Sequence, residues 1–254
     1  YFTVQGRQIF YQGKKNNDRG AIIFIHGSGE NSEVWKDQLE LDLDLNLIAM
    51  DLPSHAKSDH FPDLNLNSYV DALRALIEHL ELNEVILCGH SLGGAVIQSY
   101  YFRYPQEVEA LILCATGAKL RVSPFILDSL KNDFQQYLES IPVGAFYRKT
   151  EENVIDHVIR EVKKTEPEVT LADFSTCNQF DAMENTREIA VPSLIIVGRA
   201  DKLTPVKYSR YFKDKIANSV LVVIKKAGHM VMVEKPEQVN HAILNFIQNK
   251  VINQ

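Results

Sequence analysis

The sequence has few cysteines and no long apolar run. Cys88, Cys114 and Cys177 are an odd number without CxxC spacing, in a chain of 254 residues that needs no disulfides to be stable. We therefore expect reduced, buried thiols and a cytoplasmic protein. No stretch approaches the roughly 18 consecutive apolar residues of a membrane helix, so we expect no membrane span.

The sequence is also short of positive charge and of metal-binding patterns. It has 27 Lys and Arg against 33 Asp and Glu, a net charge of −6, and its basic runs are no longer than pairs. A net negative surface repels phosphate backbones, which argues against a nucleic-acid partner. Because it lacks HExxH, Cys/His pairs at ligand spacing and the phosphate-binding G-x-x-x-x-G-K pattern, we expect no metal and no other cofactor.

Short apolar runs alternate with amphipathic stretches along the chain, and 45% of its residues are hydrophobic. Runs without polar alternation are typical of strands that are covered on both faces, as in a parallel sheet. The six runs are Ala21–Ile25, Leu45–Met50, Val85–Cys88, Ala110–Cys114, Leu194–Val197 and Val220–Ile224. The pattern predicts an α/β fold, with a mostly parallel, twisted sheet and helices on both faces.

One region breaks this rhythm, and the N-terminus adds a hairpin. Between about 119 and 187 we find no strand pattern, only helical pieces at Phe125–Tyr137, Glu151–Lys164 and Leu171–Phe180. We therefore predict a core made of residues 1–118 and 188–254, with residues 119–187 inserted between core strands. Phe2–Val4 and Gln8–Tyr11, separated at Gly6, predict an antiparallel hairpin.

The strongest local motif is Gly89-His90-Ser91-Leu92-Gly93, which follows the run Val85–Cys88 and opens an amphipathic stretch. A serine on so tight a strand-to-helix turn is typical of a nucleophile elbow. Such a turn holds the serine in a backbone conformation that costs roughly 1–3 kcal/mol, and the flanking glycines remove side-chain clashes. The alternative is a plain glycine turn with an incidental serine.

A serine hydroxyl needs a base, and the base needs an orienting acid. Asp201 follows the apolar run Leu194–Val197, and His229 follows the run Val220–Ile224, so each stands after a strand as Ser91 does. No acidic residue directly follows the run Ala110–Cys114, the alternative place for the acid, so Asp201 is the candidate. We predict a triad of Ser91, Asp201 and His229.

A third motif, His26-Gly27-Ser28-Gly29, follows the first central run. Acyl transfer places negative charge on a carbonyl oxygen, which preorganised backbone N–H groups stabilise. We expect these oxyanion-hole donors to be the N–H groups of Ser28 and of Leu92, which starts a helix, with Gly29 as the substitute for Ser28. His26 and His90 stand on the turns and are expected to brace the loops.

With these motifs the chain resembles the α/β-hydrolase fold proteins over its whole length, and among them the small-molecule carboxylesterases. The segment 51–58 is similar to the family's D-x-P-G-H-G-x-S turn, with Ser54 and Ala56 where glycine is common. The resemblance implies that Ser91, Asp201 and His229 are the triad and that residues 119–187 are a helical lid. Relatives with an aspartate nucleophile, the dehalogenases and epoxide hydrolases, are excluded.

The resemblance implies a serine hydrolase that cleaves small, mostly apolar carboxylic esters through an acyl-enzyme. For the substrate pocket we expect apolar side chains of the insertion and of the segment after His229, namely Phe125, Leu130, Phe134, Tyr147, Met230 and Val231. Two alternatives stay open: a small-molecule receptor that keeps the triad but hydrolyses slowly, and a C–C bond hydrolase or perhydrolase using the same site.

Overall fold

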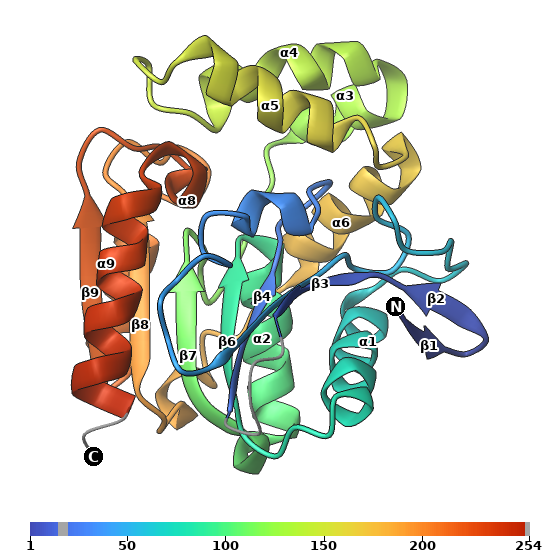
Figure 1. Ribbon diagram of the computed structural model, residues 1–254. Helices are drawn as coiled ribbons and strands as arrows, with labels where there is room; N and C mark the ends of the chain where they lie inside the picture. Colours follow the sequence, from blue (N-terminus) through green and yellow to red (C-terminus); the bar gives the residue numbers. More distant parts are fainter. Residues whose placement is uncertain (15–19, 252–254) are drawn as a thin grey trace.

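The computed structural model describes residues 1–14 and 20–251, and within them the chain forms a seven-stranded sheet of order β3-β5-β4-β6-β7-β8-β9 (Figure 1). The parallel strands are β4 (Ala21–Ile25), β5 (Asn46–Met50), β6 (Val85–His90), β7 (Val108–Cys114), β8 (Ser193–Gly198) and β9 (Ser219–Ile224). Each of the six apolar runs forms one of these strands. The predicted mostly parallel sheet is confirmed.

The N-terminal segment forms a hairpin and then joins the sheet edge. β1 (Phe2–Val4) and β2 (Arg7–Ile9) pair antiparallel across Gly6, and β3 (Tyr11–Lys14) pairs antiparallel with β5. The predicted second strand Gln8–Tyr11 is therefore divided between β2 and β3. At the junction the Phe10 N–H donates to the Ser58 hydroxyl (3.1 Å), so the chain changes partners there.

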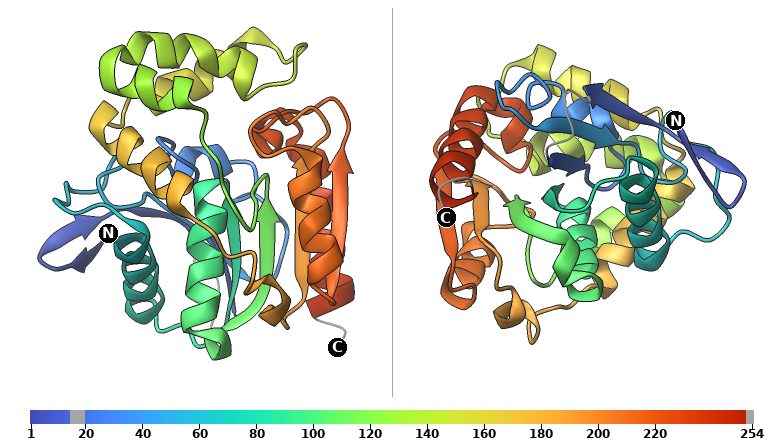
Figure 2. Two further views of the ribbon diagram at one scale, coloured as in Figure 1. Left: turned by 180° about the vertical axis from the view of Figure 1, so that it is seen from behind. Right: turned by 60° about the horizontal axis from the view of Figure 1, so that its bottom comes forward.

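Helices cover both faces of the sheet (Figure 2). α1 (Leu66–His79), α2 (Leu92–Arg103) and α7 (Val206–Lys215) cover one face, and η1 (Ser32–Trp35), α8 (Val231–Glu234) and α9 (Pro236–Phe246) cover the other. Along β4, Ile23 and Ile25 pack with the first group and Ile22 and Phe24 with the second. Burial on both faces explains why the strands read as unbroken apolar runs.

Four helices lie between β7 and β8 and stand above the carboxyl ends of the strands (Figure 1). They are α3 (Pro124–Asn132), α4 (Phe134–Gly144), α5 (Glu152–Val162) and α6 (Pro167–Gln179). The predicted single piece Phe125–Tyr137 is in fact two helices. The chain breaks at Asp133, whose carboxylate accepts a hydrogen bond from the Gln136 N–H and caps α4.

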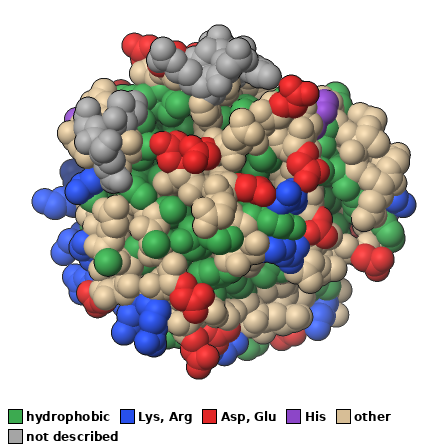
Figure 3. Space-filling model, turned by 90° about the horizontal axis from the view of Figure 1, so that it is seen from below, with side chains coloured by type: hydrophobic (Ala, Val, Ile, Leu, Met, Phe, Trp, Pro, Cys, Tyr) green, Lys and Arg blue, Asp and Glu red, His purple; other side chains and the backbone are tan. Residues whose placement is uncertain are grey.

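The remaining short elements are η2 (Pro105–Glu107), η3 (Thr186–Glu188) and the π-helical turn η4 (Ile247–Val251). On the lower face of the molecule, opposite α3–α5, acidic and basic side chains are interspersed with apolar ones (Figure 3). In residues 1–14 and 20–251, no helix combines the length and the apolar character needed to cross a membrane.

Gly93 provides a test of how tightly α2 packs against the sheet. A Cβ on Gly93 would lie 2.3 Å from the Ile25 carbonyl oxygen and 2.7 Å from that of His26, both rigid backbone atoms. We expect Gly93→Ala to destabilise the fold by about 2–3 kcal/mol, the upper part of the usual range of about 1–3 kcal/mol for overpacking, because both atoms belong to the backbone.

At roughly 2–4 °C per kcal/mol for a chain of this size, the melting temperature falls by roughly 4 °C or more, as measured by calorimetry. Gly144→Ala is the matched control, because a Cβ there meets no atom within 4 Å. Equal melting temperatures for the two variants would contradict this packing argument.

Candidate active site

Ser91 occupies a strained turn between β6 and α2. Its backbone dihedral angles are φ 51° and ψ −111°, a region that L-residues rarely adopt. The turn is possible because its glycines carry no side chain: a Cβ on Gly89 would lie 2.3 Å from the Gly93 carbonyl oxygen. Ser91 stays partly exposed at the carboxyl end of the sheet and lines the cavity described below.

The loops after β8 and β9 bring Asp201 and His229 together. His229 Nδ1 lies 2.9 Å from Asp201 Oδ2, and both residues are buried. The other carboxylate oxygen accepts hydrogen bonds from the N–H groups of Leu203 (2.9 Å) and Thr204 (2.8 Å). The carboxylate is thus held in one orientation, with Oδ2 facing the imidazole.

The pair shifts the protonation equilibria of both partners. Burial alone would lower the pKa of His229, but the charge and hydrogen bond of Asp201 raise it above its ordinary 6.5. Burial alone would raise the pKa of Asp201, yet His229 and the donors of Thr204 lower it below 3.8. At neutral pH Asp201 is therefore ionised and can stabilise a charged imidazole.

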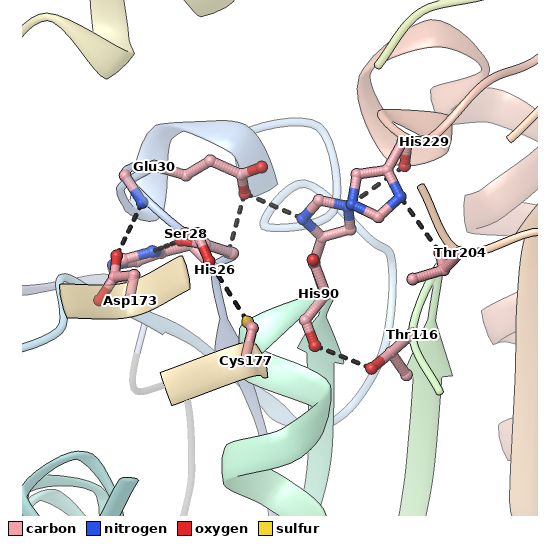
Figure 4. Close-up of polar contacts among 12 residues, drawn as sticks. His26, Ser28, Glu30, His90, Thr116, Asp173, Cys177, Thr204 and His229 are labelled. Carbon is pink, nitrogen blue, oxygen red and sulfur yellow. Dashed lines mark hydrogen bonds and ion pairs between the residues drawn. The ribbon is translucent and has the colours of Figure 1, made fainter. Parts of the chain in front are cut away.

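Thr204 belongs to this cluster, although the sequence analysis did not identify it. Its hydroxyl donates to Asp201 Oδ2 (2.8 Å) and lies 3.2 Å from His229 Nδ1 (Figure 4). Its position three residues after the acid was the only available signal, because N–H groups two and three residues after an Asp commonly bond its carboxylate. Thr204 fixes the carboxylate oxygen that faces the base.

Two carboxylates hold the loop after β4 and leave one N–H free. The Gly27 N–H donates to Glu30 Oε2 and the Gly29 N–H to Asp173 Oδ2, both at 2.8 Å. Among the described residues, the Ser28 N–H between them has no acceptor, and neither has the Leu92 N–H at the start of α2. The substitute donor Gly29 is therefore occupied, and Ser28 and Leu92 are available.

Asp173 reaches this loop from α6 of the insertion and is fully buried. Besides Gly29 it bonds the His55 imidazole (2.8 Å) and the Tyr69 hydroxyl (2.5 Å). Burial opposes the charged form of His55, but Asp173 raises the pKa of its imidazole above 6.5. No motif marks Asp173, which sits inside a plain helical stretch, so the sequence analysis missed it.

A second backbone contact ties the insertion to the base. The His229 N–H donates to the Ala145 carbonyl (2.7 Å), directly after α4. The close approach depends on Gly228, because a Cβ there would lie 2.6 Å from the same oxygen. The insertion therefore contacts both the loop that carries Ser28 and the loop that carries His229.

His26 and the turn at 51–58 brace the floor of the site. His26 Nε2 accepts a hydrogen bond from the Leu52 N–H (2.9 Å), and burial lowers the pKa of this imidazole to about 4, so it is neutral. Ser54 (φ 68°) and Ala56 (φ 42°) adopt the left-handed conformation that favours glycine. Ser54 and Ala56 therefore adopt at these two positions a backbone conformation that glycine would adopt more easily.

Two adjoining cavities meet at Ser91 and His229. The first has a volume of about 570 Å³ including its mouth, and apolar side chains of the insertion cover it: Ile126, Tyr137, Ile141, Val158, Val162 and Phe174. The second opens between the segment after β7 and the loop after β8, beside Arg121 and Lys202. No hydrogen bond joins the Ser91 hydroxyl to His229 in the described part of the chain.

The predicted pocket residues need correction. Of the six, only Met230 lines the first cavity. Phe125 is 49% exposed and Tyr147 is partly exposed, whereas Leu130, Phe134 and Val231 pack in the apolar layer between the insertion and the sheet. One position along a helix turns a side chain by about 100°, so Ile126 rather than Phe125 faces Ser91. The amino-acid composition of the segment does not determine which side of the helix faces the cavity.

A family model described as the alpha/beta hydrolase family matches residues 22–242. The chain is similar to the solved structure of a thermophilic esterase, at 36% identity, covering 98% of this chain and 96% of the other with a TM-score of 0.86.

Two curated relatives are more distant. A bifunctional esterase/perhydrolase of Acinetobacter calcoaceticus is 26% identical, with 97% of this chain and 98% of the relative covered. A pimeloyl-[acyl-carrier protein] methyl ester esterase of Pectobacterium carotovorum is 25% identical, with 93% and 96% covered. The matches span almost the full length of each protein.

The electrostatics of the Asp201–His229 pair predict an acid limit to any activity that uses His229 as a base. A base must be unprotonated, and the pKa of His229 is raised, so kcat/KM falls as pH decreases with a midpoint above 6.5. A pH profile of kcat/KM measures this directly.

Asp201→Asn removes the charge that raises this pKa, so the midpoint moves to lower pH, and kcat falls by roughly 10⁴-fold because the imidazole loses its orienting partner. Asp181→Asn, which removes an exposed carboxylate bonded to Lys119, is the control and leaves the midpoint in place. A wild-type midpoint below 6.5 would contradict the assignment.

Proposed function

Because this chain belongs to the alpha/beta hydrolase family, we propose that it cleaves small, mostly apolar carboxylic esters through an acyl-enzyme formed on Ser91. It is a hydrolase that acts on ester bonds, as its esterase relatives are. The observation that carries the finer proposal is the buried Asp201–His229 hydrogen bond of 2.9 Å at the cavity that Ser91 lines.

In the proposed reaction the Ser91 oxygen attacks the ester carbonyl while His229 Nε2 takes the hydroxyl proton. The imidazole becomes positively charged, and the Asp201 carboxylate on Nδ1 stabilises that charge and holds the ring in one tautomer. His229 then donates the proton to the leaving alcohol oxygen, which breaks the ester bond and leaves the acyl group on Ser91.

The negative charge that develops on the carbonyl oxygen needs donors that are already in place. The N–H groups of Ser28 and Leu92 suit this role, because neither has an acceptor in the described structure and Leu92 begins a helix. The helix N-terminus adds a partial positive charge at the same point. Water activated by His229 then hydrolyses the acyl-enzyme and restores Ser91.

The cavity favours an uncharged acyl group. Apart from Glu30, Ser28 and Ser140, its lining is mainly aliphatic and aromatic, and each buried methylene of a substrate contributes about 0.8 kcal/mol of binding. Space at this position supports esters with short to medium acyl chains. Met230 lines the same cavity next to His229.

We further propose that the chain consists of a core and a lid and that the protein is cytoplasmic. Residues 1–118 and 188–254 serve as the core and residues 119–187 as the lid, a division supported by the position of α3–α6 above the sheet. Cys88, Cys114 and Cys177 are free and buried, which supports a reducing, cytoplasmic setting.

Removing the nucleophile tests the proposal. Ser91→Ala lowers kcat on p-nitrophenyl butyrate by roughly 10⁴-fold or more, because no covalent intermediate forms, and a serine-directed phosphonate no longer labels the protein. Ser175→Ala, in which the lost hydroxyl donates to the Leu171 carbonyl of its own helix, is the control and keeps the wild-type rate.

Mass spectrometry of the labelled wild-type protein should place the phosphonate on the peptide that contains Ser91. A wild-type rate below about one per minute, far under the usual enzyme range of 1–10³ per second, together with tight ligand-induced thermal stabilisation would instead favour the receptor alternative.

A second substitution tests which cavity holds the acyl chain. Ile141 of α4 lines the first cavity, so Ile141→Phe fills it and shortens the preferred acyl chain in a series of p-nitrophenyl esters from acetate to decanoate. Val143→Phe is the matched control on the same helix, since Val143 is 69% exposed. An unchanged chain-length profile in Ile141→Phe would place the acyl group elsewhere.

A further inference from the structure

Two buried ionisable residues beside the triad have no part in the proposed reaction. Glu30 follows the loop that carries Ser28, and its carboxylate lies in the wall of the first cavity. His90 immediately precedes Ser91 and is fully buried. Both are located between the proposed oxyanion hole and the base.

The two side chains form a continuous chain of hydrogen bonds (Figure 4). Glu30 Oε2 accepts from the Gly27 N–H at 2.8 Å and lies 2.9 Å from His90 Nδ1. On the other side of the ring, His90 Nε2 lies 3.1 Å from the His229 carbonyl oxygen. The contacts therefore run from the Ser28 loop to the backbone of the base.

The charges of this pair have to balance. A carboxylate beside the point where an oxyanion forms would oppose the reaction if it stood alone. The two ring nitrogens of His90 face oxygen atoms on opposite sides, Glu30 Oε2 at 2.9 Å and the His229 carbonyl oxygen at 3.1 Å. Burial alone would raise the pKa of Glu30, but His90 and the Gly27 N–H lower it below its ordinary value, so the carboxylate is ionised.

We infer that Glu30 and His90 are a charge-compensated pair of positioning residues. The pair fixes the position of the Ser28 loop relative to the His229 backbone, and its charges set the electrostatic potential at the His229 imidazole. The inference rests on the proposed acyl transfer at Ser91. It assigns to His90 more than the loop-bracing role expected from the sequence, and it explains why an acidic residue is tolerated in this cavity.

The potential at His229 has several sources. His229 faces Asp201 of the β8 loop, Glu234 of α8 and Glu30, and each of these carboxylates favours the charged imidazole. The His90 ring lies against it, with centroids 4.7 Å apart. Glu30 in turn faces His90 and His26, while the hydroxyl of Tyr137 and the thiol of Cys114 are within its electrostatic reach.

Removing one charge at a time should move the acid limb of kcat/KM in opposite directions. Glu30→Gln keeps an oxygen acceptor for Gly27 but removes the negative charge, so the limb shifts to lower pH by roughly half a pH unit or more. His90→Asn leaves Glu30 uncompensated, so the limb shifts to higher pH and kcat falls roughly tenfold or more.

The double variant Glu30→Gln/His90→Asn separates charge from packing. If the pair acts through charge balance, the double variant recovers at least part of the kcat lost in His90→Asn, and its acid limb lies between those of the single variants. Glu33→Gln makes the same charge change three residues along the chain and, as the control, leaves the limb in place. Equal limbs in wild type and Glu30→Gln, or a double variant slower than His90→Asn, would overturn the inference.

A measurement without turnover keeps this inference separable from the proposed function. In the Ser91→Ala background, NMR titration of the His229 imidazole Cε1–H reports its pKa directly, and Glu30→Gln lowers that pKa. A lowered His229 pKa in NMR, together with no measurable ester hydrolysis by the wild-type protein, would contradict the proposed function but support the role of Glu30 and His90. Ester hydrolysis by the wild-type protein, together with an unchanged His229 pKa in Glu30→Gln, would support the proposed function and contradict the inferred role of the pair.

Discussion

The close approach of α2 to the ends of β4 and β6 is the constraint on which the rest of the site depends. It is possible because Gly89 and Gly93 carry no Cβ atoms, which would otherwise overlap backbone atoms at 2.3 Å. That contact forces Ser91 into its left-handed conformation and places the first N–H of α2 next to the loop after β4. The positions of Ser91 and of the Leu92 N–H are therefore consequences of one packing contact between main chains.

Three buried carboxylates hold the loops around the site by accepting hydrogen bonds from their backbone N–H groups. Asp201, Glu30 and Asp173 each accept two or more hydrogen bonds from N–H groups or buried side chains, and each has one edge toward a histidine. Loops with glycine at several positions would be mobile on their own, because glycine loses the most conformational freedom on folding. The hydrogen bonds of these buried acids hold the loops in place, and they leave the Ser28 and Leu92 N–H groups without an acceptor in the described structure.

The sequence predicts much of the fold, since strands buried on both faces leave unbroken apolar runs, and it predicts which residues converge. The proximity of Ser91, Asp201 and His229 could be predicted because each follows a parallel strand, and the carboxyl ends of such strands meet at one edge. Asp173, Thr204 and the Glu30–His90 contact could not, because they depend on tertiary distances that no local motif records. The pocket residues were predicted less well for another reason. In α3, Ile126 rather than Phe125 faces the cavity, and composition does not determine which side of a helix faces inward.

The two backbone contacts of the insertion have a consequence for how molecules reach Ser91. Asp173 in α6 holds Gly29, and the carbonyl after α4 holds His229, so lifting the insertion as a hinged flap would dismantle both loops at once. The second cavity, which the exposed Arg121 and Lys202 flank, reaches Ser91 and His229 with both loops in place. A ligand that enters beside these two side chains therefore meets Ser91 and His229 already held in place by their hydrogen-bonded loops.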